Sequence, residues 1–333
     1  MSQRRATVCS KAALQVSRRV RRVPARRSAC ANIAAAFREG RRRKMKVLVT
    51  GVNGQVGWEL ARRVPAGVTL DATDRAVLDL ATDDVAARVI ARRPEVIVNV
   101  AAYTAVDRAE SESALAHRVN ADGAGALARA ARELGARLVH VSTDFVFDGS
   151  ASRPYAPGCA PAPLGAYGAS KLAGERRVLE ESAGRSVIVR TAWVYSAHGN
   201  NFVKTMLRLM RERERVAVVA DQVGTPTWAG LLAGALWELA LRPEVEGILH
   251  WTDLGVASWY DFAVAIQEEA LARGLLERAV PIEPIRTEDY PTPARRPAYS
   301  VLDKSVALAA LAAPRQHWRV ALRAMLDDLE QDG

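Results

Sequence analysis

The chain has 333 residues, of which 49% are apolar, enough to bury one large core or two modest ones. No stretch approaches the ~18 consecutive apolar residues of a membrane span, so we expect no membrane association. The net charge of +10 is confined to one end. Residues 1–44 carry twelve Arg and two Lys against Glu39, whereas the rest of the chain holds 33 basic and 36 acidic side chains. This distribution argues against a nucleic-acid-binding surface on the folded body.

The basic segment 1–44 shows no hydrophobic periodicity, so we expect a disordered extension. Its Arg-rich, Ser-containing composition is also typical of an organellar transit peptide. Because Met45 to Val49 is typical of a first strand, a mis-assigned start is the favoured interpretation, and a functional extension is the alternative. Cys9, Cys30 and Cys159 show no metal-ligand spacing or disulfide framework, which favours a reducing, cytoplasmic location.

The body begins with a β-branched run, a glycine-rich turn and a helical pattern between Lys46 and Val64. Gly51 permits a tight turn, Gly54 lets a phosphate approach the backbone, and Gly57 allows close packing of helix on strand. A turn of this kind is often no more than a turn, so alone it only weakly indicates a dinucleotide site. The cofactor contacts predicted here are Gly51, Asn53, Gly54, Gln55, Val56 and Gly57.

A second strand, Val68 to Asp74, ends on an acid 23 residues after Gly51. An acid near this spacing binds the adenosine ribose 2′-hydroxyl of NAD, whereas the neighbouring Arg75 could pair with the 2′-phosphate of NADP. The sequence leaves both cofactors open. Further cofactor contacts are expected at Asp79 and Leu80.

The following segments continue the alternation of strands and helices. A buried strand and small-residue loop, Pro94 to Glu110, place cofactor contacts at Ala101, Ala102 and Tyr103, and an Ala-rich helix ending at Gly135 then precedes a strand, Arg137 to Ser142. This alternation predicts βαβ units and a parallel sheet whose ligands gather at the carboxyl ends of its strands.

The predicted fold class is α/β, with two parts after the basic extension. Residues 45–192 are expected to form a Rossmann-like, doubly wound parallel sheet that binds NAD(P). Residues 193–333 are richer in Trp, Pro and Arg and are expected to form mainly a smaller, partly interleaved α/β substrate domain, with some segments returning to the sheet.

Tyr167 and Lys171 stand four residues apart where a loop becomes a helix, so they would project from one helix face. The alternative is an ordinary surface pair. A neutral tyrosine can donate a proton to a carbonyl being reduced, and a cationic Lys171 is expected to lower the pKa of that phenol. Thr143 would hydrogen-bond the substrate oxygen. Since no side chain donates hydride, this chemistry requires a nicotinamide cofactor.

A glycine turn, Ser142-Thr143 and Tyr167-x-x-x-Lys171 in this order resemble the extended short-chain dehydrogenase/reductases. Seven ordered blocks resemble the dTDP-4-dehydrorhamnose reductases from about Met45 to Met325: GQVGWEL, NVAAYTAVDRAE, VHVSTDFVFDG, YGASKLAGE, RTAWVYSAHGNNFVKTML, DQVGTPTWA and TPARRPAYSVLD. The resemblance implies reduction of the 4-keto group of dTDP-6-deoxy-L-lyxo-4-hexulose to dTDP-L-rhamnose by NADPH or NADH. It also implies that Lys171 bonds the nicotinamide ribose.

One position departs from this family. Phe145 stands where the family commonly has Tyr, which removes a hydroxyl and leaves fine substrate preference open. The intact Thr143, Tyr167 and Lys171 should preserve catalysis.

Substrate contacts are expected at Asp144, Trp193, Asn201 and Arg295. Trp193 is interpreted as stacking on thymine or covering the sugar, with a core tryptophan as the alternative. Asn201, Arg295 and Arg296 could bind the diphosphate, since arginine suits phosphate geometry, although arginines in such a loop are as often only solvated.

Two residues carry weaker expectations from the family. Asn120 either supports a proton relay or caps a helix. Glu59 lies on the first helix, where some family members gather acids around Mg²⁺ at a dimer interface; a lone helical Glu is more often solvent-facing. A homodimer is therefore possible.

Three other functions stay open. The same fold serves as a non-catalytic, cofactor-binding regulatory subunit, but the intact Thr143, Tyr167 and Lys171 argue against it. A reductase or epimerase acting on another nucleotide sugar would share these motifs. Nucleic-acid binding through residues 1–44 is the least favoured.

Overall fold

A computed structural model of the chain describes residues 44–331. The expectations for the basic extension, Lys44 apart, and for Cys9 and Cys30 concern residues outside this range. None of the helices within residues 44–331 is long and apolar enough to cross a bilayer. Cys159, the cysteine within this range, is buried.

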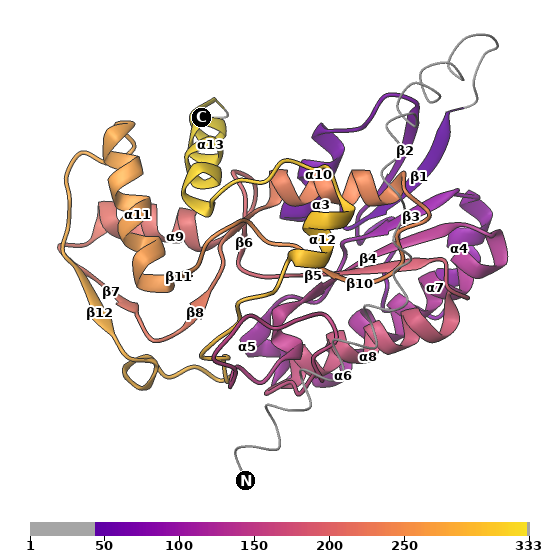
Figure 1. Cartoon of the computed structure of the whole chain (residues 1–333), viewed down its shortest axis with the longest axis horizontal. Coiled ribbons are helices and arrows are strands. Elements are labelled where there is room, and N and C mark those ends of the chain that lie inside the picture. Colours follow the sequence, from indigo (N-terminus) through magenta and orange to yellow (C-terminus); the bar gives the residue numbers. More distant parts are fainter. Residues whose placement is uncertain (1–43, 332–333) are drawn as a thin grey trace.

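The centre of the structure is a six-stranded, wholly parallel sheet with the order β10-β5-β4-β3-β1-β2 (Figure 1). Its strands are β1 (Met45–Thr50), β2 (Val68–Thr73), β3 (Val96–Asn99), β4 (Arg137–Thr143), β5 (Ser186–Thr191) and β10 (Gly247–His250). The strand order reverses at β1, which lies between β2 and β3. Ligands of open α/β sheets bind at such a reversal, outside the carboxyl ends of the strands. The predicted Rossmann-like α/β fold is confirmed.

Helices cover both faces of the sheet (Figure 1). On one face lie α3 (Gln55–Arg62), α10 (Ala229–Ala240) and α12 (Ser305–Ala310); on the other lie α4 (Val85–Arg92), α7 (Gly123–Leu134) and α8 (Ala166–Glu181). Alternation along the strands explains this arrangement. Val47 of β1 packs in the core that contains Leu232 of α10, whereas the adjacent Leu48 packs with Leu127 of α7.

Short helical turns connect these layers near the carboxyl ends of β3 and β4. They are α5 (Val106–Ala109), α6 (Ser113–His117), the π-helix η1 (Arg118–Asp122) and the 3-10 helix η2 (Asp144–Val146).

A second core lies beside the sheet and is built mainly from α9 (Phe202–Glu212), α11 (Trp259–Ala272) and α13 (Trp318–Gln331). Small pairs of strands complete this part: β6 (Val194–Tyr195) with β9 (Thr227–Trp228), β7 (Val216–Val219) with β12 (Ile282–Ile285), and β8 (Val223–Gly224) with β11 (Ala257–Ser258), and the 3-10 helix η3 (Thr287–Asp289) follows β12. Strand β10 is part of the sheet and helix α10 packs against it, so the second half of the chain contributes to both cores. The domain boundary at residue 192 stays a prediction.

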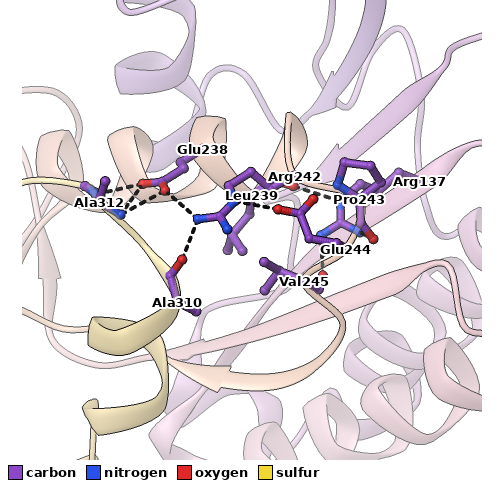
Figure 2. Close-up of polar contacts among 10 residues, drawn as sticks. Arg137, Glu238, Leu239, Arg242, Pro243, Glu244, Val245, Ala310 and Ala312 are labelled. Atoms are coloured by element: carbon purple, nitrogen blue, oxygen red, sulfur yellow. Dashed lines mark hydrogen bonds and ion pairs between the residues drawn. The ribbon is translucent and has the colours of Figure 1, made fainter. Parts of the chain in front are cut away.

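Figure 2 shows the polar contacts around the C-terminal end of α10, at the amino-end edge of the sheet. Arg137, the first residue of β4, is only 6% exposed and donates to the carbonyls of Leu239 (2.8 Å), Pro243 (3.1 Å) and Val245 (2.5 Å). The last carbonyls of a helix lack partners within that helix. Here Arg137 donates to one of them, Leu239, and to two carbonyls of the following turn. Glu238 of the same helix accepts bonds from the backbone beyond α12. These contacts fasten α10 to the sheet.

We predict that Arg137→Met lowers the free energy of unfolding by about 2–4 kcal/mol, because the buried carbonyls lose their donor. Urea denaturation followed by circular dichroism measures the change. Arg185→Met is the matched control, since this exposed arginine makes one bond to the Gly135 carbonyl. Equal losses in the two variants would contradict the assignment.

Candidate active site

A cavity of about 1050 Å³ opens at the carboxyl end of the sheet. All the predicted cofactor contacts line it: Gly51, Asn53, Gly54, Gln55, Val56, Gly57, Asp74, Arg75, Asp79, Leu80, Ala101, Ala102, Tyr103, Tyr167 and Lys171. Thr143, Asp144 and Trp193 line the same cavity. The chain therefore brings these residues into one site, while their individual binding roles stay predictions.

The glycine turn after β1 requires its glycines. Gly51 has φ +73°, and a Cβ there would lie 2.7 Å from the Cα of Ala101. A Cβ at Gly57 would lie 2.2 Å from the carbonyl oxygen of Gly51. Helix α3 then begins after Gly54 with no side-chain cap and no acid in its first turn. Its free N–H groups and the helix dipole suit an anion such as the diphosphate of a dinucleotide.

The end of β2 presents an acid and an arginine to the same cavity. Both carboxylate oxygens of Asp74 are engaged, one by the side chain of Asn53 (3.0 Å) and one by the N–H of Val77 (3.0 Å). The side chain of Arg75 is 76% exposed and uses only its Nε toward Asp79, at 3.2 Å. A bond from the N–H of Ala81, aided by Arg75, keeps the pKa of Asp79 below its ordinary value. The side chain of Arg75 thus stays largely exposed where it lines the cavity.

Three side chains form the predicted catalytic group. Thr143 ends β4 and is buried; its hydroxyl donates to Asp144 Oδ1 (3.0 Å) and accepts from the N–H of Phe145 (3.2 Å). Tyr167 and Lys171 lie in the first turns of α8. The ring of Phe145 lies nearly perpendicular to that of Tyr167, with centroids 5.5 Å apart.

The electrostatics differ from the expectation. Burial raises the pKa of Tyr167 to about 12; Thr143 opposes this rise and the charge of Asp144 adds to it. Burial also lowers the pKa of Lys171 to about 8, against the effect of Glu175. The ammonium of Lys171 donates to the carbonyl of Val141 at 2.7 Å. The predicted lowering of the Tyr167 pKa by Lys171 is therefore wrong: desolvation dominates, and the phenol holds its proton throughout the physiological range.

A buried ion pair lies one turn beyond Lys171. Arg190 of β5 donates to both carboxylate oxygens of Glu175, at 2.8 and 2.6 Å, and the hydroxyl of Ser142 on β4 donates to the same carboxylate at 2.5 Å. Both members of the pair are 2% exposed. These bonds fix α8 against β4 and β5, and with it the relation of Tyr167 to Thr143.

Known proteins share this chain's sequence and fold. A family model described as the RmlD substrate binding domain matches residues 45–331. The dTDP-4-dehydrorhamnose reductase of Burkholderia thailandensis is 45% identical over 296 residues, 86% of this chain and 99% of that protein. The enzyme of the same name from Escherichia coli K12 is 43% identical over 294 residues, 86% of this chain and 98% of that protein.

A solved structure agrees. The crystal structure of dTDP-4-dehydrorhamnose reductase from Bacillus anthracis in complex with NADP is 36% identical, has a TM-score of 0.80, and covers 86% of this chain and 99% of that one. The chain belongs to the dTDP-4-dehydrorhamnose reductase family.

Two predicted substrate contacts of this family member lie in the cavity wall. Burial raises the pKa of Asp144 to about 6, against the effect of hydrogen bonds with Ser300 and Thr143. Trp193 has φ +48° and stacks on Trp259, with centroids 3.5 Å apart. Trp193 packs against the second core and also lines the cavity, and its contact with substrate stays a prediction.

The remaining substrate predictions do not reach the cavity. Asn201 caps α9, accepting from the N–H of Lys204 (3.2 Å), and its amide donates to Gln55 Oε1 (3.1 Å), so its polar atoms are used within the chain. Arg295 is exposed and is not among the cavity-lining residues. Arg296 pairs with Asp107 at 2.8 Å. The structure therefore does not support the diphosphate contacts predicted at these three positions.

Asn120 lies in the π-helix and is neither a cap nor free for a relay through its side chain. It accepts from the N–H of Tyr103 (2.8 Å) and donates to the carbonyl of Tyr103 (3.1 Å) and to the hydroxyl of Ser170 (3.0 Å). It thereby fixes the loop after β3 against α8.

Glu59 is fully buried, contrary to the solvent-facing alternative. It pairs with Arg63 and accepts a hydrogen bond from Ser196 at 2.9 Å. Within residues 44–331, no three His, Cys, Asp or Glu side chains are grouped to hold a metal ion. The Mg²⁺ site at Glu59 stays a prediction.

Two parts of the site were not predicted from the sequence. Gly199 and Asn200 line the cavity and stand in the block HGNNFV, in which only Asn201 was assigned a role. The ion pair of Glu175 and Arg190 was not predicted either, because no local motif indicates it.

We predict that Glu175→Gln lowers the pKa of Lys171 below about 8, because the neighbouring negative charge that favours the ammonium is removed. A pH titration by ¹³C NMR with labelled lysine measures this pKa, and Lys171→Arg assigns the signal. Glu180→Gln, an exposed change on the same helix, should leave the pKa unchanged. An unchanged value in Glu175→Gln would contradict the electrostatic role of Glu175.

Proposed function

We propose that the protein reduces the 4-keto group of dTDP-6-deoxy-L-lyxo-4-hexulose to dTDP-L-rhamnose, with NADPH as the hydride donor. Family membership supports the substrate. The observation that carries the chemistry is the meeting of Thr143, Tyr167 and Lys171 in one cavity with the glycine turn. Its assembly as a homodimer and its cytoplasmic location stay predictions from the sequence.

The residues of the cavity suit a dinucleotide. Gly51 and Gly57 let the backbone approach closely, the uncapped start of α3 offers N–H groups to the diphosphate, and Arg75 offers a guanidinium to a 2′-phosphate. When bound, the nicotinamide supplies the hydride.

The proton step belongs to the side chains. The hydroxyl of Thr143 can turn from Asp144 to the substrate oxygen and fix it beside the phenol. Tyr167, protonated at neutral pH, then donates its proton from Oη to the developing alkoxide, a far stronger base than phenolate. Lys171, mostly protonated at pH 7, contributes positive charge that favours the resulting phenolate.

We expect Tyr167→Phe to reduce turnover by at least ~10²-fold, the lower range for loss of a general acid, with NADPH binding retained. A coupled assay with the keto-sugar and fluorescence titration with NADPH measure the two quantities. Tyr290→Phe is the control, since Tyr290 is 61% exposed and is not among the cavity-lining residues. Turnover near the wild-type value in Tyr167→Phe would refute the assignment.

Arg75→Ala should raise the Kd of NADPH about tenfold or more and leave that of NADH nearly unchanged, because only NADPH carries the 2′-phosphate. Fluorescence titrations with both cofactors measure this, with the exposed Arg153→Ala as control. Equal weakening of both cofactors would show that Arg75 does not select between them.

A further inference from the structure

The segment Ser196–Asn201, between β6 and α9, crosses from the second core to the glycine turn. We call these six residues the strap. Gly199 and Asn200 line the cavity together with Gly54 and Gln55. A segment from the half of the chain expected to bind the sugar therefore also lines the cavity next to the turn expected to bind the cofactor.

Three strap residues hold the turn and helix α3. The Nε2–H of His198 donates to the carbonyl of Asn53 at 3.0 Å, and the amide of Asn201 donates to Gln55 Oε1 at 3.1 Å. The hydroxyl of Ser196 donates to the buried carboxylate of Glu59 at 2.9 Å. Each bond joins residues more than 130 positions apart in the sequence.

The strap is also braced internally. The hydroxyl of Ser196 accepts from the N–H of His198 (3.1 Å), and the carbonyl of Ser196 accepts from the amide of Asn201 (2.7 Å). Lys204 donates to the carbonyl of Ala197 at 3.1 Å. These bonds give the strap one defined conformation rather than leaving it an open loop.

Ring packing fixes His198 as well. Its imidazole stacks on Trp58 of α3, with centroids 5.1 Å apart and planes 8° apart. The guanidinium of Arg62 lies over the same indole ring, 4.2 Å from its centroid. The stacking orients the imidazole so that Nε2 meets Asn53.

The consequence concerns the direction of the backbone N–H groups. These groups bind a diphosphate only if the turn keeps one conformation, and a turn that must be ordered on binding loses affinity. Asn53 is held at both ends, its carbonyl by His198 and its side chain by Asp74. The strap thus removes freedom from the peptide that precedes Gly54.

We propose that the strap is an outer wall of the dinucleotide's diphosphate site, and that His198 and Asn201 are positioning residues that hold the glycine turn in its phosphate-binding conformation. This inference rests on the proposed function, because it takes the ligand of the turn to be the dinucleotide.

The test compares NADPH binding among strap variants of the full chain. His198→Phe keeps a ring for Trp58 but has no donor for Asn53, and His198→Gln restores a donor without the ring. Asn201→Ser keeps a hydroxyl that can cap α9 but cannot reach Gln55. Fluorescence titration gives the Kd of NADPH, and stopped-flow displacement gives its dissociation rate.

The expected result is a Kd for NADPH about three- to tenfold higher in His198→Phe, the range for one lost hydrogen bond, expressed mainly as faster dissociation. Asn201→Ser should weaken binding at least as much, because it loses the bonds to Gln55 and to the carbonyl of Ser196. His198→Gln should recover most of the affinity. Arg137→Met is the control for general loss of stability, because Arg137 lies at the amino end of β4, whereas the cavity opens at the carboxyl ends of the strands. The Kd of NADPH for this variant should match that of the wild type.

Three results would overturn the inference. Wild-type affinity in both His198→Phe and Asn201→Ser would show that the strap does not position the turn. Equal weakening in Arg137→Met would assign the effect to stability, and no recovery in His198→Gln would remove the role of the hydrogen bond. Failure of the wild-type protein itself to bind NADPH would instead refute the proposed function, and the strap inference with it.

Discussion

The active-site geometry depends on the buried ion pair between Glu175 of α8 and Arg190 of β5. Thr143 is carried by a strand, whereas Tyr167 and Lys171 are carried by a helix, so their alignment needs a fixed joint between the two layers. The bidentate hydrogen bonds from Arg190 to Glu175, together with the bond from Ser142 to the same carboxylate, hold the helix against the strands. A buried ion pair adds little net stability over an apolar pair, but loss of one partner is costly. The contribution of the Glu175–Arg190 pair is therefore to fix the position of α8 relative to β4 and β5.

A second joint links the two halves of the chain. Glu59, on the first helix after β1, pairs with Arg63 and is bound by Ser196 from the far side of the cavity. A carboxylate that the family pattern associates with metal thus serves here to connect the cofactor-binding turn with the segment that faces it.

The sequence predicted the fold and most of the cavity, because both depend on local signals. The glycines of the turn, the alternation of strands and helices, and the spacing of Tyr167 and Lys171 can be interpreted without knowing any distant contact. The environments of Asn201 and Glu59 were not predicted, because each forms a hydrogen bond with a residue over 130 positions away along the chain. The predicted lowering of the Tyr167 pKa was wrong for a related reason. Surrounding segments bury the phenol, and this burial raises its pKa and outweighs the effect expected of Lys171.

The sixth strand of the sheet, β10, comes from the second half of the chain and pairs with β5. Helix α10 likewise packs on β3 and β4 from that half. A fragment ending at residue 192 would leave β5 as an open edge with unpaired backbone groups, and would bare the apolar face beneath α10. Such a piece would tend to self-associate. The first core is thus built from segments of both halves of the chain.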